Sequence, residues 1–172
     1  MYLNLSQVKY RVTKLATIIK APRNTLPTFG HSEQSGRPHV EVDANGYNYI
    51  VAERGQEFER HTTSDLEELL YDIFESVTFE LACKYELANR ISGRDSRRLM
   101  FTHQEQLLSQ LHQAWGQRRK QEHEQILEKH PFDDYASIRA TFSKELREQG
   151  NLSEVAWKMA CEKYPLPEEP KK

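Results

Sequence analysis

The sequence predicts an α+β fold that is mostly α, with a small antiparallel β-hairpin or three-stranded sheet near the N-terminus packed on four to five helices, two of them long. Two patterns predict this class. Apolar residues recur at three- and four-residue steps over most of the 172 residues, which is typical of amphipathic helices. Between residues 40 and 51 they alternate around an Asn-Gly pair, which is typical of a hairpin. We expect a single domain over residues 1–164 and a disordered tail over 165–172.

The first helix is expected from about Leu5 to Ile19, where apolar residues share one face and Pro22 ends the pattern. The following segment, Ala21 to Pro38, carries three prolines and two glycines without periodicity. A loop of this length in a compact domain is usually functional or mobile. Its part from Arg23 to Arg37 is therefore a candidate partner-binding surface.

The hairpin is predicted from the alternation in Val40–Val42 and Tyr47–Val51. The Asn45-Gly46 pair between them accepts the positive φ angles of a two-residue type I′ turn. After Gly55, the run Glu57 to His61 is a candidate third strand, since its charges suit an unpaired sheet edge.

Two long helices are expected next. Ser64 and Glu67 form a capping-box pattern, and one apolar face continues from there to Ala88. The second helix starts near Asp95 and keeps its apolar face to Trp115. Beyond Gly116 the sequence is polar all round, so we expect the helix to project into solvent or to kink there. Pro131 ends the element.

Two shorter helices complete the chain. Asp133 or Asp134 is expected to cap a helix that runs to Gly150, and Asn151 or Ser153 to open the last one. That last helix carries Val155, Trp157, Ala160 and Tyr164.

Composition narrows the possible functions. The chain is 37% hydrophobic and 29% charged with a formal net charge of −2, so it has no general attraction to nucleic acid or to an anionic membrane. Cys83 and Cys161 lie in helical patterns and are expected to be free, buried thiols, which fits a reducing compartment. We find no signal-peptide pattern and no membrane-spanning pattern, and expect a cytoplasmic protein.

The residues favour no catalytic or metal chemistry. His112 and His123 would lie roughly 16 Å apart on one helix, too far to share a zinc ion with His130. No serine sits in a glycine elbow, no cysteine–histidine pair is indicated, and no glycine-rich phosphate loop follows a strand. The adjacent Asp133 and Asp134 are better explained as helix-capping residues than as an acid/base pair. We therefore expect no enzyme, no metal and no cofactor.

The segment from Asn89 to Phe101 concentrates charge between the two long helices. Four arginines, Arg90, Arg94, Arg97 and Arg98, surround Asp95. Such a cluster is compatible with an ion-pair network, an anion site or a partner-docking surface. With a second basic step at Arg118, Arg119 and Lys120, it also leaves open a nucleic-acid-associated regulator.

An acidic ridge is predicted on the first long helix. Glu68, Asp72 and Glu75 follow steps of four and three residues and so share one helix face. Like charges at this spacing are mildly unfavourable. They would favour association with a basic partner, because complementary charge speeds encounter.

Several sequence blocks together resemble the immunity protein 63 family of bacterial polymorphic-toxin systems of the contact-dependent inhibition type. They are Y-N-Y-I-V-A-E-R-G-Q-E, D-L-E-E-L-L-Y-D-I-F, F-E-L-A, N-R-I-S-G-R-D-S-R-R-L-M-F and H-P-F-D-D. The resemblance extends over roughly Tyr47 to Asp134, about half of the chain.

The resemblance implies a non-catalytic protein that binds the C-terminal domain of a cognate secreted toxin in the cytoplasm. The toxin's activity (nuclease, deaminase or pore former) and a monomeric or homodimeric state both stay open. Partner contacts are expected on the acidic ridge and the long loop. Asp95 is expected to balance two arginines between the long helices. The matched charged residues expected to form a structural ion-pair network are Glu53, Arg54, Arg90, Asp95, Arg97 and Arg98.

Overall fold

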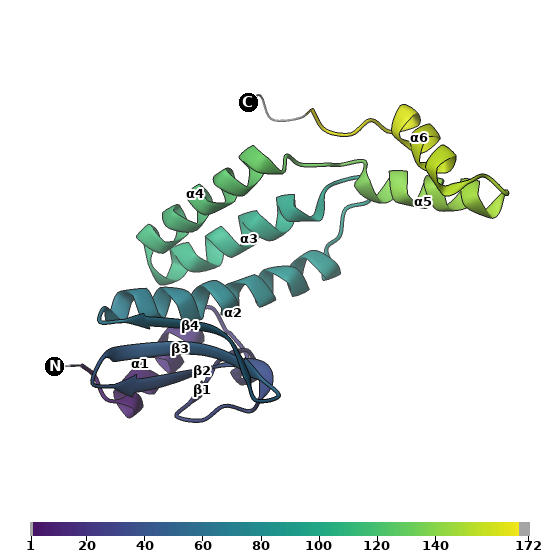
Figure 1. Ribbon diagram of the computed structural model, residues 1–172. Coiled ribbons are helices and arrows are strands. Elements are labelled where there is room, and N and C mark those ends of the chain that lie inside the picture. The colour runs from purple at the N-terminus through teal and green to yellow at the C-terminus, as the bar shows by residue number, and fades with distance from the viewer. Residues whose placement is uncertain (1, 169–172) are drawn as a thin grey trace. The chain divides into compact units, whose positions relative to one another are not determined.

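The computed structural model describes residues 2–168, and within them the chain forms six α-helices and a four-stranded sheet (Figure 1). The α+β class is confirmed, with one strand and one helix more than the sequence predicted. In chain order the elements are α1 (Leu5–Ile18), the 3-10 turn η1 (Arg23–Thr25), β1 (Thr28–Phe29), β2 (Ser35–Asp43), β3 (Gly46–Glu53), β4 (Gln56–Thr63), α2 (Leu66–Ala88), α3 (Ser96–Leu111), α4 (Gln113–Lys129), α5 (Ala136–Glu148) and α6 (Ser153–Lys163).

The chain divides into two compact units. Unit 1 holds the described residues up to Leu81 together with Gln104–Arg119, and unit 2 holds Ala82–His103 together with the described residues from Lys120 onward. Helices α2, α3 and α4 each contribute residues to both units. The single domain over residues 1–164 stays a prediction. Of the predicted tail, residues 165–168 contain no helix or strand, and residues 169–172 lie outside the described part.

The sheet of unit 1 has the order β1-β2-β3-β4. Strands β2, β3 and β4 form an antiparallel meander, and the two-residue β1 pairs with β2 in parallel. The predicted third strand is therefore present as edge strand β4. The long loop after α1 is shorter than expected, because η1, β1 and the start of β2 lie within it. The Arg37 side chain fixes this segment by donating from Nε to the Leu26 carbonyl oxygen at 2.9 Å.

The hairpin is confirmed, but its type I′ turn was predicted at the wrong place. Asp43 pairs with Gly46, so the β2–β3 loop is Ala44-Asn45, and of these four residues only Gly46 has a positive φ. The β3–β4 turn has the positive φ angles instead, +50° at Arg54 and +81° at Gly55. A two-residue loop with both central φ angles positive is the type I′ arrangement.

The apolar core of unit 1 lies against one face of the sheet. It joins inward-facing residues of β2 and β3 to α1, α2, the second half of α3 and the start of α4. Alternation along the strands sends Tyr47 and Tyr49 to the same face, and both are buried. The buried members are Val8, Val12, Ala16, Ile19, Leu26, Val40, Tyr47, Tyr49, Leu69, Leu70, Tyr71, Ile73, Phe74, Val77, Leu107, Leu108 and Trp115.

Helix α2 runs to Ala88, as predicted, but Ser64 is not its N-cap residue. Asp65 directly precedes the helix, and its carboxylate accepts the Glu67 N–H at 2.9 Å. The Asp65 N–H in turn donates to the Thr63 hydroxyl at 3.0 Å. A carboxylate at this position satisfies a backbone donor that the helix leaves unpaired.

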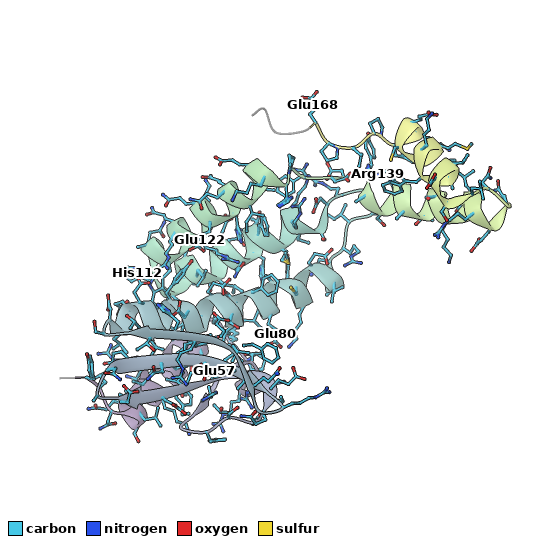
Figure 2. The ribbon with its side chains drawn as sticks, viewed as in Figure 1. Glu57, Glu80, His112, Glu122, Arg139 and Glu168 are labelled. Carbon is cyan, nitrogen blue, oxygen red and sulfur yellow. The ribbon has the colours of Figure 1, made fainter. Side chains whose placement is uncertain are left out.

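The predicted second long helix is in fact two helices. The chain reverses at His112, which lies at the turn between α3 and α4 (Figure 2). The His112 Nδ1 atom accepts the Ala114 N–H at 3.2 Å. Gly116 then lies so close to α3 that an added Cβ would be 2.9 Å from the Glu105 carbonyl oxygen. The polar run after Gly116 packs against neighbouring helices, where we expected a projection into solvent or a kink: Arg119 pairs with Glu75 of α2, and His123 stacks on Phe101 of α3.

The start of α5 departs from the sequence prediction, whereas α6 begins at Ser153, one of its two predicted starts. Tyr135 precedes α5 without a side-chain cap, so neither Asp133 nor Asp134 is its N-cap. Gly150 does follow α5 with φ +96° as expected, and the Gly150 and Asn151 N–H groups donate to carbonyl oxygens of the last helical turn. On α6 the buried residues are Ala156 and Ala160.

Two of the four apolar residues that the sequence places on the last helix lie outside its buried face. Val155 and Trp157 are both exposed. Neither Cys83 nor Cys161 forms a disulfide within the described residues, and each is partly exposed, where buried thiols were expected.

Gly46 should be essential to the hairpin. Its φ is +132°, and an added Cβ would lie 2.3 Å from the Thr63 carbonyl oxygen. We expect Gly46→Ala to lower the free energy of unfolding by about 2–4 kcal/mol, from backbone strain and overlap together, as measured by denaturant titration. The matched control is Gly55→Ala, since Gly55 has φ +81° but open space around it. Its expected loss is about 1–2 kcal/mol. Equal losses in both variants would contradict the overlap.

Candidate functional site

The charged segment singled out in the sequence forms the loop between α2 and α3 and the first turn of α3, all in unit 2. The structure separates two of the expected network residues from it. Glu53 and Arg54 lie at the β3–β4 turn in unit 1, where Arg54 Nε is 3.4 Å from the Glu53 carboxylate. The Arg54 side chain is 90% exposed, so this pair contributes little to stability.

Asp95 connects two loops of unit 2. Its carboxylate accepts the Arg97 N–H at 2.9 Å and the Asp133 N–H at 2.8 Å. The Asp95 N–H donates in return to the Asp134 carboxylate at 2.8 Å. The α2–α3 loop and the α4–α5 loop are thus joined by reciprocal hydrogen bonds between backbone and carboxylate.

Arg97 strengthens the same connection. Its guanidinium is 2.6 Å from the Asp95 carboxylate, and it also donates to the His130 and Pro131 carbonyl oxygens at 2.9 and 2.8 Å. Those carbonyls follow the end of α4, where backbone acceptors have no partner within the helix. One side chain therefore balances Asp95 and satisfies the C-terminal end of a helix.

Arg98 pairs with Asp134, although the sequence suggested that Asp95 would balance two arginines. Two nitrogens of the Arg98 guanidinium donate to the two Asp134 oxygens at 2.8 and 2.9 Å. The guanidinium also lies 4.1 Å from the centre of the Phe132 ring. We call Asp95, Arg97, Arg98, Asp133 and Asp134 the Asp95 interlock.

The pKa values of the interlock carboxyls follow from these contacts. The Arg98 guanidinium lowers the pKa of Asp134 to about 2. Burial opposes ionisation of Asp95, whose side chain is 9% exposed, but the Arg97 side chain and two backbone N–H groups outweigh burial and hold its pKa below the usual range. Both groups are therefore ionised near neutral pH.

Arg90 pairs with a buried carboxylate that sequence reasoning missed. Glu86 is 4% exposed, and its two oxygens accept from Arg90 at 2.9 and 2.8 Å. The hydrogen bond from Arg90 lowers the Glu86 pKa. Glu86 lies in the last turn of α2 and Arg90 just beyond its end, and the four-residue step between them could have indicated the pair.

Arg139, labelled on α5 in Figure 2, was also missed. It is 1% exposed, pairs with Asp133, and donates to the Tyr164 and Pro165 carbonyl oxygens at 3.1 and 3.0 Å. Its buried helix face includes Ser143 and Leu146, at steps of four and three. That periodicity was a readable signal, but an arginine in a polar stretch is normally assigned to the surface.

Two adjoining hollows open beside the α2–α3 loop, with volumes of about 360 and 570 Å³. They share five lining residues: Glu86, Ile91, Arg94, Asp95 and Ser96. The smaller hollow adds an apolar wall from Leu99 and Phe132. The chemistry available there is binding through one cation and an apolar wall.

The three residues of the predicted acidic ridge lie on α2 in unit 1, and each is paired. Glu68 is 2.8 Å from Arg118, and Glu75 is 2.7 Å from Arg119. Asp72 pairs with His61 of β4. Burial raises the Asp72 pKa, and the contact with His61 only partly offsets this effect. Arg118 and Arg119, which the sequence left open as phosphate contacts, thus serve as counter-ions of the ridge.

No three histidine, cysteine, aspartate or glutamate side chains within residues 2–168 are placed to hold a metal ion. No helix in the described range has the length and apolar character needed to cross a membrane.

Removing the Asp95 carboxylate should destabilise the fold. Asp95→Ala leaves Arg97 and two backbone N–H groups without their acceptor, so we expect a loss of about 2–4 kcal/mol in the free energy of unfolding. Glu148→Ala is the matched control, because Glu148 forms an exposed pair with Lys144 at 3.7 Å and should change stability little. A melting temperature of Asp95→Ala equal to that of the control would contradict the role of the interlock.

The interlock also predicts acid sensitivity. The folded-state pKa of Asp134 lies below its unfolded value, so the stabilisation is present above about pH 4 and is lost as the pH falls toward 2. Melting temperatures between pH 6 and pH 2 should fall less steeply for Asp134→Asn than for the wild type. Parallel curves would show that this pair does not contribute.

Comparisons with known proteins give one match. Residues 43–125, just under half of the chain, match the family described as Immunity protein 63. This range contains Asp95, Arg97 and Arg98 but ends before the H-P-F-D-D block and Arg139. Searches of curated proteins and of solved structures found no match. The family assignment made from the sequence blocks is confirmed over residues 43–125, which match the Immunity protein 63 family.

Proposed function

We propose that this chain is an immunity protein that binds the C-terminal domain of a cognate secreted bacterial toxin in the cytoplasm and neutralises it without catalysis. The observation that carries the proposal is the family match over residues 43–125. The family description names immunity proteins, and immunity to a toxin requires recognition of that toxin.

The arrangement of charges supports a binding role. In the interlock and around it, carboxylates are engaged with arginines and with backbone N–H groups that fix two loops. A surface held rigid in this way loses little conformational entropy when a partner binds. Recognition by a pre-formed surface fits this arrangement better than acid/base work, which needs a group whose pKa lies near neutrality.

The acidic ridge and the segment Arg23 to Arg37 remain proposed toxin contacts. Because Glu68, Asp72 and Glu75 are paired, the ridge presents balanced charges, and a basic partner would have to compete with Arg118 and Arg119. The arginines that suggested a nucleic-acid-associated regulator are largely engaged with carboxylates. Their pairing disfavours that alternative.

The proposal predicts specific protection in cells. The toxin domain encoded beside this chain should kill a test strain when expressed alone, and co-expression of the chain should restore survival by several orders of magnitude. An immunity protein for an unrelated toxin, expressed at the same level, is the control. Killing that persists beside folded, abundant chain would overturn the proposal.

A further inference from the structure

We infer that the smaller hollow beside the α2–α3 loop receives an acidic side chain of the toxin, with Arg94 as its counter-ion. This inference rests on the proposed function and specifies the chemistry of the partner: a glutamate or aspartate that lies next to an apolar residue. Arg94 would hold the carboxylate, and the apolar wall would take the neighbouring side chain.

The first support is the balance of charge around the hollow. Four carboxylates are each paired with an arginine: Glu86 with Arg90, Asp95 with Arg97, Asp134 with Arg98, and Asp133 with Arg139. Arg94 is a fifth arginine in this region. Within residues 2–168 its guanidinium makes no hydrogen bond and no ion pair, although its charge helps to lower the pKa of Asp134. The region therefore has one positive charge without a counter-ion.

The second support is the position of that charge. Arg94 is exposed and lines both hollows, so an incoming group can reach it without displacing an existing pair. Ile91, which is 48% exposed, lines both hollows, and Leu99 and Phe132 line the smaller one. A cation beside an apolar wall suits a side chain with an apolar body and an anionic end, because both parts find a matching surface.

The third support is rigidity. The Arg94 N–H donates to the Ile91 carbonyl oxygen at 3.3 Å and closes the loop that carries Arg94. Gly93 supplies a positive φ of +74° in this loop. Directly after Arg94, the Asp95 interlock ties the loop to the α4–α5 loop. The Arg94 backbone is thus fixed before binding, which favours a specific contact over an adaptable one.

The experiment measures binding of the purified chain to the purified toxin C-terminal domain encoded beside it, by biolayer interferometry at several salt concentrations. We expect Arg94→Gln to raise the Kd at least fivefold and Arg94→Glu at least twentyfold. The association rate of both variants should depend less on salt than that of the wild type. The Kd of Arg94→Lys should stay within threefold of the wild-type value. The Kd of Ile91→Ala should lie between that of Arg94→Lys and those of Arg94→Gln and Arg94→Glu.

The control separates this contact from a general effect of charge. Arg11→Glu makes the same charge change at an exposed arginine on α1, in unit 1, and should bind within twofold of the wild type. Because the Arg94 side chain makes no hydrogen bond or ion pair with the described part of the chain, Arg94→Gln should also melt within a few degrees of the wild type. Equal weakening by Arg11→Glu and Arg94→Glu would overturn the inference.

Other outcomes distinguish the inference from the proposed function. Tight binding by the wild type with unchanged binding by Arg94→Gln and Arg94→Glu overturns the hollow as the site and leaves the immunity function standing. No binding by the folded wild type overturns both. Weakened binding confined to the Arg94 and Ile91 variants supports the inference.

Discussion

The structure of unit 2 depends on the reciprocal bonding between Asp95 and the segment Asp133-Asp134. Each side provides a carboxylate to the other side's backbone N–H, so neither loop can move without breaking both bonds. Arg97 adds the carbonyls after α4 to the same group. A carboxylate as buried as Asp95 is tolerated only with full pairing. The loops that shape the two hollows are therefore joined by hydrogen bonds and ion pairs.

The same requirement explains where unpaired charge remains. Within the described part of the chain, the carboxylates of the α2–α3 and α4–α5 loops are paired with other arginines. Arg94 has no such counter-ion there. On α2, the ridge carboxylates recruit Arg118 and Arg119 of α4 and His61 of β4. A surface feature that looks highly charged in sequence can thus be nearly neutral in the fold. For a protein that recognises another protein, the few charges left over carry more information than the total.

Unit 1 is organised differently, around an apolar core on one face of its sheet. Gln104 is a fully buried polar side chain in this unit: its amide donates to the Glu75 carbonyl oxygen at 3.0 Å, and its oxygen accepts from Arg119 Nε at 3.1 Å. This side chain links α2, α3 and α4 inside the unit. Arg119 therefore contacts both the buried Gln104 and the acidic ridge. These contacts explain why the polar run after Gly116 remains helical and packed.

The sequence by itself determined the features that are local. Periodicity located α1, α2 and the β2–β3 hairpin, Gly150 located the end of α5, and ordered sequence blocks identified the family. Alternation and helical repeats are properties of neighbouring residues, so they can be read without a fold.

Only the tertiary structure decided which charges meet. The reversal at His112 separates α3 from α4, whereas the helical pattern continues through it. That reversal brings Arg118 and Arg119 to the ridge. Asp134 became the partner of Arg98 across 36 residues, and Arg139 became a buried cation. The physical reason is that an ion pair depends on distance in space, and residues far apart in sequence carry no local signal of it. In the sequence Arg94 is one of four equivalent arginines. It becomes distinct only in the fold, where the other three are paired with carboxylates.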